Sequence, residues 1–199
     1  MSSGTTRLTP EQILTAAIRL MQRKGFGALG MREIAQHLQI KAPSLYHHFP
    51  SKEALAQRAL EQYRLEQRLH LQSLSKRKTL AERLLGYAGL FSRMLKEDAR
   101  LCLFLVLSQE RASVSAPCIK ELRHFVDQNI SWLEITLQSR RPRGSARTRL
   151  SARETAQVLF GAFEGFMMTS VCESRPERSF LENARNLLSA LDLVPRGAH

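Results

Sequence analysis

Apolar residues recur every three or four positions along almost the whole chain, and no stretch shows the strict alternation typical of a half-buried strand. Proline and glycine fall mostly between these periodic segments, where they begin or end helices. Four glycines inside segments are exceptions: Gly86, Gly89, Gly161 and Gly165. The sequence therefore predicts an all-α fold.

The periodic segments divide the chain into nine expected helices. The first begins in the capping box of Thr9 and Gln12, with proline at its first position, and ends at Gly25. Two short helices follow at about 31–38 and from Pro43 to Phe49, and Ser51 caps a longer one that runs from Lys52 to about Leu74. The remaining helices are expected at about 80–96, 98–109, 115–139, 151–171 and 176–191. An arginine-rich loop at 140–147 interrupts them, and we interpret it as a solvated surface.

Charge is distributed unevenly over the 199 residues. The chain carries a net charge of +12, of which the first 78 residues hold +8. A basic surplus of this size favours polyanionic partners, and its position directs attention to the N-terminal part.

Several classes of protein find no support in the sequence. No nucleophile elbow, phosphate-binding loop, zinc-protease or dinucleotide motif occurs, which argues against an enzyme, and neither a metal nor a cofactor is expected. His47 and His48 are adjacent on a helix and cannot form a metal pair. The three cysteines are odd in number and widely spaced, so a disulfide framework is not expected.

The chain is expected to be soluble and cytoplasmic. Its N-terminus lacks the apolar segment of a signal peptide. The apolar stretch 158–171 is too short to span a bilayer and contains Glu164. Residues 193–199 resemble the remnant of a protease-cleavage tag and are set aside.

The two short helices carry the pattern of a DNA reader. Leu45 and Phe49 point inward, so Ser44 and His47 share the opposite face, and Lys41 stands at the entrance. Small or polar groups so placed can reach base edges and phosphates in a major groove. Lys52 opens a helix, where a nearby DNA phosphate would offset its unfavourable position on the helix dipole.

Three consecutive motifs carry a family resemblance: 31–35 (MREIA), 45–49 (LYHHF) and 51–55 (SKEAL). In order and spacing they resemble the N-terminal signature of the TetR family of transcriptional regulators, over about residues 10–60. The resemblance implies a helix-turn-helix domain at 8–55 and a regulatory and dimerisation domain at 56–192. It also implies that Tyr46 and Lys52 contact phosphate, while Lys41, Ala42 and Ser44 read bases, with His47 following.

Two positions depart from the family pattern. Gly30 precedes Met31 where many members have a capping threonine, which puts a phosphate contact there in doubt. Gln39 stands in the turn where many have glycine, and a left-handed conformation there would cost about 1–2 kcal/mol.

The resemblance further implies a homodimer that binds a palindromic DNA operator and is released by a small-molecule effector, with repression as the family default. Large, adaptable side chains supply candidates for the effector pocket, although plain core packing is the more usual role of any single one of them. These candidates are Phe91, Met94, Cys102, Phe104, Phe125, Trp132, Phe163, Phe166 and Met167. The candidates for the dimer interface, each of which could instead pack internally, are Gly161, Ala162, Gly165, Phe180, Ala184, Leu187, Leu188 and Leu191.

Cys102 attracts a further hypothesis. It is expected early in the sixth helix, where the helix terminus and nearby Arg100 would favour a reactive thiolate. The segment through Trp132 is similar to the subgroup of the N-ethylmaleimide reductase repressor, which implies a cysteine that senses electrophiles. The competing interpretation is a buried, inert thiol, which the apolar neighbours favour.

A basic module for general interactions is the remaining rival function. It would account for the charge but not for the motif at 45–49. Selective binding of one DNA duplex over random DNA separates the two.

Overall fold

The computed structural model describes residues 8–139 and 150–195. Within them the chain forms nine α-helices, a short 3-10 helix at Arg111–Ser113 and no strand, in agreement with the predicted all-α class. The helices are α1 (Pro10–Lys24), α2 (Met31–His37), α3 (Ala42–His48), α4 (Lys52–Ser75), α5 (Leu80–Lys96), α6 (Leu103–Gln109), α7 (Ala116–Gln138), α8 (Ala152–Ser170) and α9 (Pro176–Ala190). None of these helices is both long and apolar enough to cross a bilayer. The arginine-rich loop at 140–147 and positions 196–199 lie outside the described residues.

Side chains define several helix starts. The predicted capping box of α1 is confirmed: the Gln12 backbone N–H donates to Thr9 Oγ1 at 3.3 Å, and the Thr9 N–H donates to Gln12 Oε1 at 2.9 Å. Ser51 Oγ accepts from the Ala54 N–H at 3.1 Å at the start of α4, as expected. Capping boxes also open α5 and α8, led by Thr79 and Ser151. These caps satisfy N–H groups that a helix leaves without partners.

The expected helix at 98–109 is wrong in its first five residues. Asp98 and Ala99 adopt φ values of 64° and 49°. The Ala99 N–H donates to the carbonyl of Leu95 and the Arg100 N–H to that of Met94, which closes the end of α5. The chain therefore turns before α6 begins at Leu103, and Cys102 precedes that helix.

The helices group into two compact units. The first contains described residues up to Glu66 together with Leu103–His124, so it extends beyond the expected 8–55 domain; the second contains Gln67–Cys102 and the described residues from Phe125 onward. The continuous helices α4 and α7 each contribute to both.

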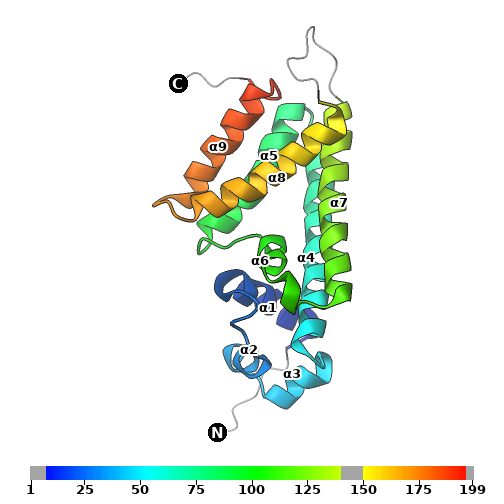
Figure 1. The fold of residues 1–199 in the computed structure, drawn as a ribbon, viewed down its shortest axis with the longest axis vertical. Coiled ribbons are helices and arrows are strands. Elements are labelled where there is room, and N and C mark those ends of the chain that lie inside the picture. Colours follow the sequence, from blue (N-terminus) through cyan, green and yellow to red (C-terminus); the bar gives the residue numbers. More distant parts are fainter. Residues whose placement is uncertain (1–7, 140–149, 196–199) are drawn as a thin grey trace. The chain divides into compact units, whose positions relative to one another are not determined.

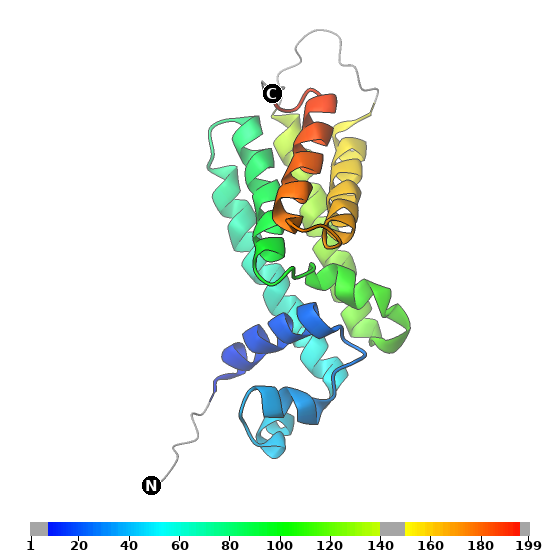
Figure 2. The ribbon, with the colours of Figure 1, turned by 90° about the vertical axis from the view of Figure 1, so that its left-hand side faces the viewer.

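The first unit has one apolar core. Figure 2 shows its N-terminal helices, with α1 beside the first part of α4 and above α2 and α3. Ile13, Phe26 and Leu45 are buried in this core. Leu103 and Leu107, far away in the sequence, join the same core and explain why the segment 103–124 folds with the N-terminal helices.

The connection between α1 and α2 is held through the peptide of Phe26. Its N–H donates to Glu110 Oε1 at 2.9 Å, and its carbonyl accepts from Lys52 Nζ at 3.1 Å. The Lys52 ammonium also lies 4.3 Å from the centroid of the Phe26 ring, a cation–π geometry. Gly27 borders this arrangement, because a Cβ at that position would overlap the Glu110 carboxylate.

In the second unit, α5, α8 and α9 pack against one another (Figure 1). Phe180, Ala184 and Leu188 of α9 are fully buried. Leu193 and Val194, set aside above as part of a tag remnant, are also buried, and the Leu193 N–H donates to the Leu188 carbonyl at 2.9 Å.

We predict that positions 27 and 110 are energetically coupled. Glu110→Ala removes a charged acceptor and should cost about 1.5–3 kcal/mol of unfolding free energy. Gly27→Ala displaces the same carboxylate and should cost about 1–2 kcal/mol through the weakened hydrogen bond. The double variant should lose clearly less than the sum, because the added methyl group then has nothing to displace.

Urea unfolding of the four proteins in this cycle provides the measurement. Gly89→Ala is the matched control: no atom lies within 4 Å of a Cβ there, and a helix interior gains roughly 0.5–1 kcal/mol from alanine. Strictly additive losses at 27 and 110 would contradict the coupling.

Candidate nucleic-acid interface and regulatory site

The short helix α3 separates a buried face from an exposed one. Leu45 is fully buried and Phe49, directly after the helix, is 4% exposed. Because these two side chains fix the rotation of α3, Ser44 and His47 are exposed on its other side. Replacing Leu45 with alanine would cost about 2–5 kcal/mol, which measures how firmly the face is set.

The other predicted reading residues lie around this exposed face. Lys41 is the N-cap of α3 and is exposed, and Tyr46 is exposed by 45%. Ala42 is half-buried and packs against the core of the first unit. The structure therefore brings Lys41, Ser44, Tyr46 and His47 to one short exposed segment, while Ala42 offers less surface.

The turn between α2 and α3 sets the orientation of α3 relative to α2. Gln39 has a φ of 55°, the left-handed conformation considered for it. The Ile40 N–H donates to the Ala35 carbonyl at 3.0 Å, and the Gln39 N–H to the Gln36 carbonyl at 3.0 Å. A non-glycine residue here carries a strain of about 1–2 kcal/mol, which these closing hydrogen bonds help to offset. At Gly30, no side chain caps the start of α2.

Lys52 opens α4, as the sequence predicts, and also makes a contact within the subunit. Its ammonium is half-buried and already donates to the Phe26 carbonyl, as described above. A lysine ammonium has three N–H donors, so this bond leaves donor capacity for a phosphate. The intramolecular contact was not visible in the sequence, because Phe26 and Lys52 are 26 residues apart.

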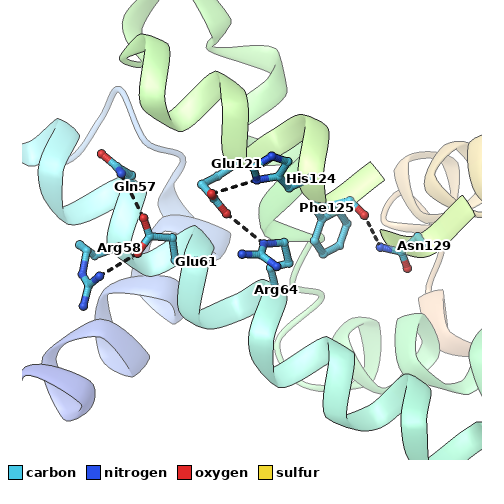
Figure 3. A network of polar contacts seen from close by, with 8 residues as sticks. All are labelled: Gln57, Arg58, Glu61, Arg64, Glu121, His124, Phe125 and Asn129. Atoms are coloured by element: carbon cyan, nitrogen blue, oxygen red, sulfur yellow. Dashed lines mark hydrogen bonds and ion pairs between the residues drawn. The ribbon is translucent and has the colours of Figure 1, made fainter. Parts of the chain in front are cut away.

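A second polar arrangement in the first unit links α4 to α7. Arg64 Nε donates to Glu121 Oε2 at 2.9 Å, and His124 Nδ1 lies 3.1 Å from Glu121 Oε1 (Figure 3). Burial would raise the pKa of Glu121, but the hydrogen bonds and charges of Arg64 and His124 hold it below its usual value. This arrangement ties the two helices together beside the apolar core.

The second unit gathers aromatic rings around Tyr87, a residue that the sequence analysis did not select. Its ring lies 5.3 Å from Phe91, 5.4 Å from Trp132 and 5.8 Å from Phe163, measured between centroids. The Phe180 ring, expected at a dimer interface, instead stacks on Phe91 at 5.6 Å. Three predicted pocket residues therefore do lie together.

The remaining pocket candidates are more dispersed. Phe166 lies 6.5 Å from Phe163, and Met167 accepts the Cys102 N–H at its sulfur at 3.1 Å. Phe125 faces Phe160 at 6.4 Å, and Met94 is half-buried. Phe104 packs against the core of the first unit, so it does not belong to this group.

The polar groups of Tyr87 and its neighbour Asn129 all have hydrogen-bond partners. The buried Tyr87 hydroxyl donates to Asn129 Oδ1 at 2.9 Å, and Gln67 Nε2 donates to the same oxygen at 2.9 Å. Asn129 Nδ2 in turn donates to the Phe125 carbonyl at 2.8 Å (Figure 3). Burial, followed by the charges of Glu164 and Cys102, raises the pKa of Tyr87 well above 10, so its hydroxyl stays protonated and donates.

Glu164 is a buried polar residue of a different kind. Its position in the apolar stretch 158–171 counted against a membrane span, but nothing in the sequence indicated that its side chain is buried. It is 4% exposed, and neither carboxyl oxygen meets an N–H or O–H donor among the described residues. Burial raises the pKa of this carboxyl to about 8, although a hydrogen bond from the weakly donating Cys102 thiol offsets part of the effect.

The cysteines lie in contrasting surroundings. Cys102 is 1% exposed and lies next to α6 rather than within it. Cys118 is also buried, and burial together with Glu121 raises its pKa to about 11. Cys172 is exposed. The helix that was expected to begin at residue 98 and to activate Cys102 begins only at Leu103, so Cys102 lies just before it. A sensing role for this thiol stays a prediction.

The dimer candidates divide between the two last helices. Gly161 and Gly165 are exposed on α8, and a Cβ at either position would meet no atom within 4 Å. Val158 and Met168, exposed by 43% and 37%, lie on the same helix. On α9, the buried residues already pack within the second unit, while Leu187 and Leu191 are half-buried, as is Ala162 of α8. Of the predicted set, the α8 glycines are the part left uncovered.

Comparisons with known proteins agree with this geometry. Residues 13–59 match the family model of bacterial regulatory proteins of the tetR family. Over 57 residues the chain is 44% identical to the transcriptional repressor BdcR of Escherichia coli, a match that spans 29% of this chain and 29% of BdcR. Over 194 residues it is 26% identical to the E. coli transcriptional repressor NemR, covering 92% of this chain and 94% of NemR.

Solved structures share the whole architecture. A TetR-family regulator from Agrobacterium tumefaciens superposes with a TM-score of 0.80 at 24% identity, covering 92% of this chain and 96% of that one. Reduced E. coli NemR gives a TM-score of 0.74 at 23% identity, covering 89% and 95%. The N-terminal reader therefore matches the tetR family model, and the chain as a whole is similar in sequence and in fold to regulators of that family.

Proposed function

We propose that the chain is a transcriptional repressor that binds a palindromic DNA operator as a homodimer and is released by a small-molecule effector. The observation that carries the proposal is the rigid placement of α3. Its inner face is fixed by buried Leu45 and Phe49, and its outer face presents Ser44, Tyr46 and His47 to solvent. A helix of this kind enters the major groove in helix-turn-helix proteins.

A two-fold dimer contains two copies of the reader. Such a dimer presents one recognition helix to each of two half-sites about 34–36 Å apart, so the DNA site is an inverted repeat. The uncovered face of α8, with Gly161 and Gly165 at its centre, supports an interface there because small residues permit close helix approach. BdcR and NemR are both named repressors, which supports repression over activation.

The effector is assigned to the second unit. The rings around Tyr87 provide the apolar, adaptable lining that small-molecule sites use. We expect a non-covalent ligand rather than modification of Cys102, because that residue is only 1% exposed. The continuous helices α4 and α7, which contribute to both units, offer a physical route by which ligand binding alters the reader.

Phosphate contacts and base contacts should be separable by mutation. Tyr46→Phe and Lys52→Ala should weaken binding to all sequences about equally, and Lys52→Ala should reduce the magnitude of the salt slope by roughly one, because one released counterion is lost. Ser44→Ala and His47→Ala should relax the preference at particular base pairs by about 1–3 kcal/mol each.

The measurement is operator binding at several salt concentrations, after selection of the site from genomic fragments. Lys120→Ala, on an exposed position of α7, changes the net charge equally and should leave the salt slope unchanged. Unfolding must be followed for Lys52→Ala, since this variant also loses the bond to Phe26. If all four reader variants lost affinity equally for every sequence, the division into phosphate contacts and base contacts would be contradicted. Equal affinity of the wild type for random DNA and for the selected site would favour a general basic module.

Dimer formation should depend on the small residues of α8. Gly161→Arg places a long charged side chain on an exposed position where nothing in the subunit obstructs it, so the fold should persist while the dimer dissociates. Sedimentation would then give a monomer, and operator affinity should fall at least tenfold because half-sites are bound singly.

Ile135→Arg is the matched control, because Ile135 is 68% exposed on α7 of the same unit. It should remain dimeric. A dimer that survives Gly161→Arg but not Ile135→Arg would move the interface to α7.

A further inference from the structure

Glu164 is the only carboxylate among the described residues that is buried, and neither of its oxygens meets an N–H or O–H donor there. It lies in the middle of α8, between Phe163 and the exposed Gly165. A buried carboxylate without a partner is costly, so natural proteins pair it, protonate it or use it to bind something. Here the only partner that the described residues offer is the weakly donating Cys102 thiol.

Among the described residues, no positively charged group acts on Glu164. The ionisable groups that act on it are the Tyr87 hydroxyl from α5 and the Cys102 thiol from the segment before α6. Neither side chain can become a cation. Glu164 is therefore a potential negative charge that no cation among the described residues neutralises.

Aromatic rings complete the surroundings. Glu164 contributes to the raised pKa of Tyr87, whose ring stacks with those of Trp132 and Phe163 at centroid distances of 5.4 Å and 5.8 Å. The faces of such rings are electron-rich and attract cations, most strongly when water is excluded. A carboxylate and several rings attract the same class of ligand.

The type of cation follows from the small number of ligand groups near Glu164. A Ca²⁺ or Mg²⁺ ion needs about six oxygen ligands, and the described residues contain no group of three or more His, Cys, Asp or Glu that could hold a metal. Guanidinium and primary ammonium groups would bring several N–H donors into an environment with few acceptors. A substituted ammonium ion with an apolar surface requires only opposite charge and aromatic contact.

We propose that the second unit binds an organic ammonium ion, with Glu164 as its counter-ion and the rings around Tyr87 as its apolar wall. The inference rests on the proposed function, since it names the chemical class of the effector. Binding ionises Glu164 and expels its proton, so the neutral carboxyl of the empty site becomes half of an ion pair.

The expected pH dependence follows from the carboxyl. With a pKa of about 8, Glu164 is mostly protonated at pH 6 and must lose its proton when a permanent cation binds. Affinity should therefore rise nearly tenfold per pH unit below pH 8 and level off above it. A quaternary ammonium probe carries no proton of its own, so this slope reports on the protein.

The experiment compares choline with 3,3-dimethylbutan-1-ol, in which carbon replaces the charged nitrogen. Both are titrated into the full-length protein by calorimetry and by the fluorescence of Trp132, the single tryptophan of the chain, which stacks on Tyr87. The wild type should bind choline at least tenfold more tightly than the alcohol at pH 8. Glu164→Gln should abolish both this preference and the pH slope.

Glu173→Gln, at an exposed position after α8, is the matched control and should behave as the wild type. The pH dependence of the melting temperature gives a second readout, which tests whether Glu164 is buried. A raised pKa in the folded state means that stability falls as pH rises from about 4.5 to 8, so the melting temperature of the wild type should decline over this range more than that of Glu164→Gln.

Equal affinity for choline and the alcohol, no choline binding, or a preference that survives in Glu164→Gln would overturn the inference. Operator binding is measured separately on the same proteins. Operator binding without a cation site would leave the proposed function intact, whereas cation binding without operator recognition would remove the repressor proposal and keep the site.

Discussion

The first unit depends on how a single peptide is held. The Phe26 N–H and carbonyl are engaged from opposite directions by Glu110 and Lys52, which belong to parts of the chain 84 and 26 residues away. A loop peptide without such partners would be costly to bury beside an apolar core. Because Lys52 opens α4 and Glu110 follows α6, this contact joins the α1–α2 connection to both segments and supports the base of the reader.

Local signals in the sequence were sufficient for much of the fold. Thr9, Pro10 and Ser51 mark helix starts through their own chemistry, and the alternation of inward and outward residues on α3 follows from seven positions. The segment 98–102 was mistaken for helix because Asp98 and Ala99 take a left-handed conformation that neither residue type strongly signals. The bonds that stabilise this turn belong to the preceding helix.

The candidate sites were less accessible from sequence than the fold, because they depend on tertiary packing. Nothing near Phe104 in the sequence indicates that it packs against the core of the first unit rather than with the other aromatic candidates. Phe180 shows the same problem in reverse, since an apolar face on α9 suits an interface and an interior equally. Glu164 is the clearest case: a carboxylate in an apolar helix could face water, and only the packed structure reveals that it is enclosed.

The division of α3 into a fixed and an exposed face also bears on how such a protein can evolve. Leu45 and Phe49 determine stability, whereas Ser44 and His47 contribute little to packing. Exposed substitutions usually change stability by less than about 0.5 kcal/mol. New operator preferences can therefore arise at the outer positions by single mutations that leave folding untouched. Duplicated copies of such a regulator could diverge in their target genes while inheriting an unchanged scaffold.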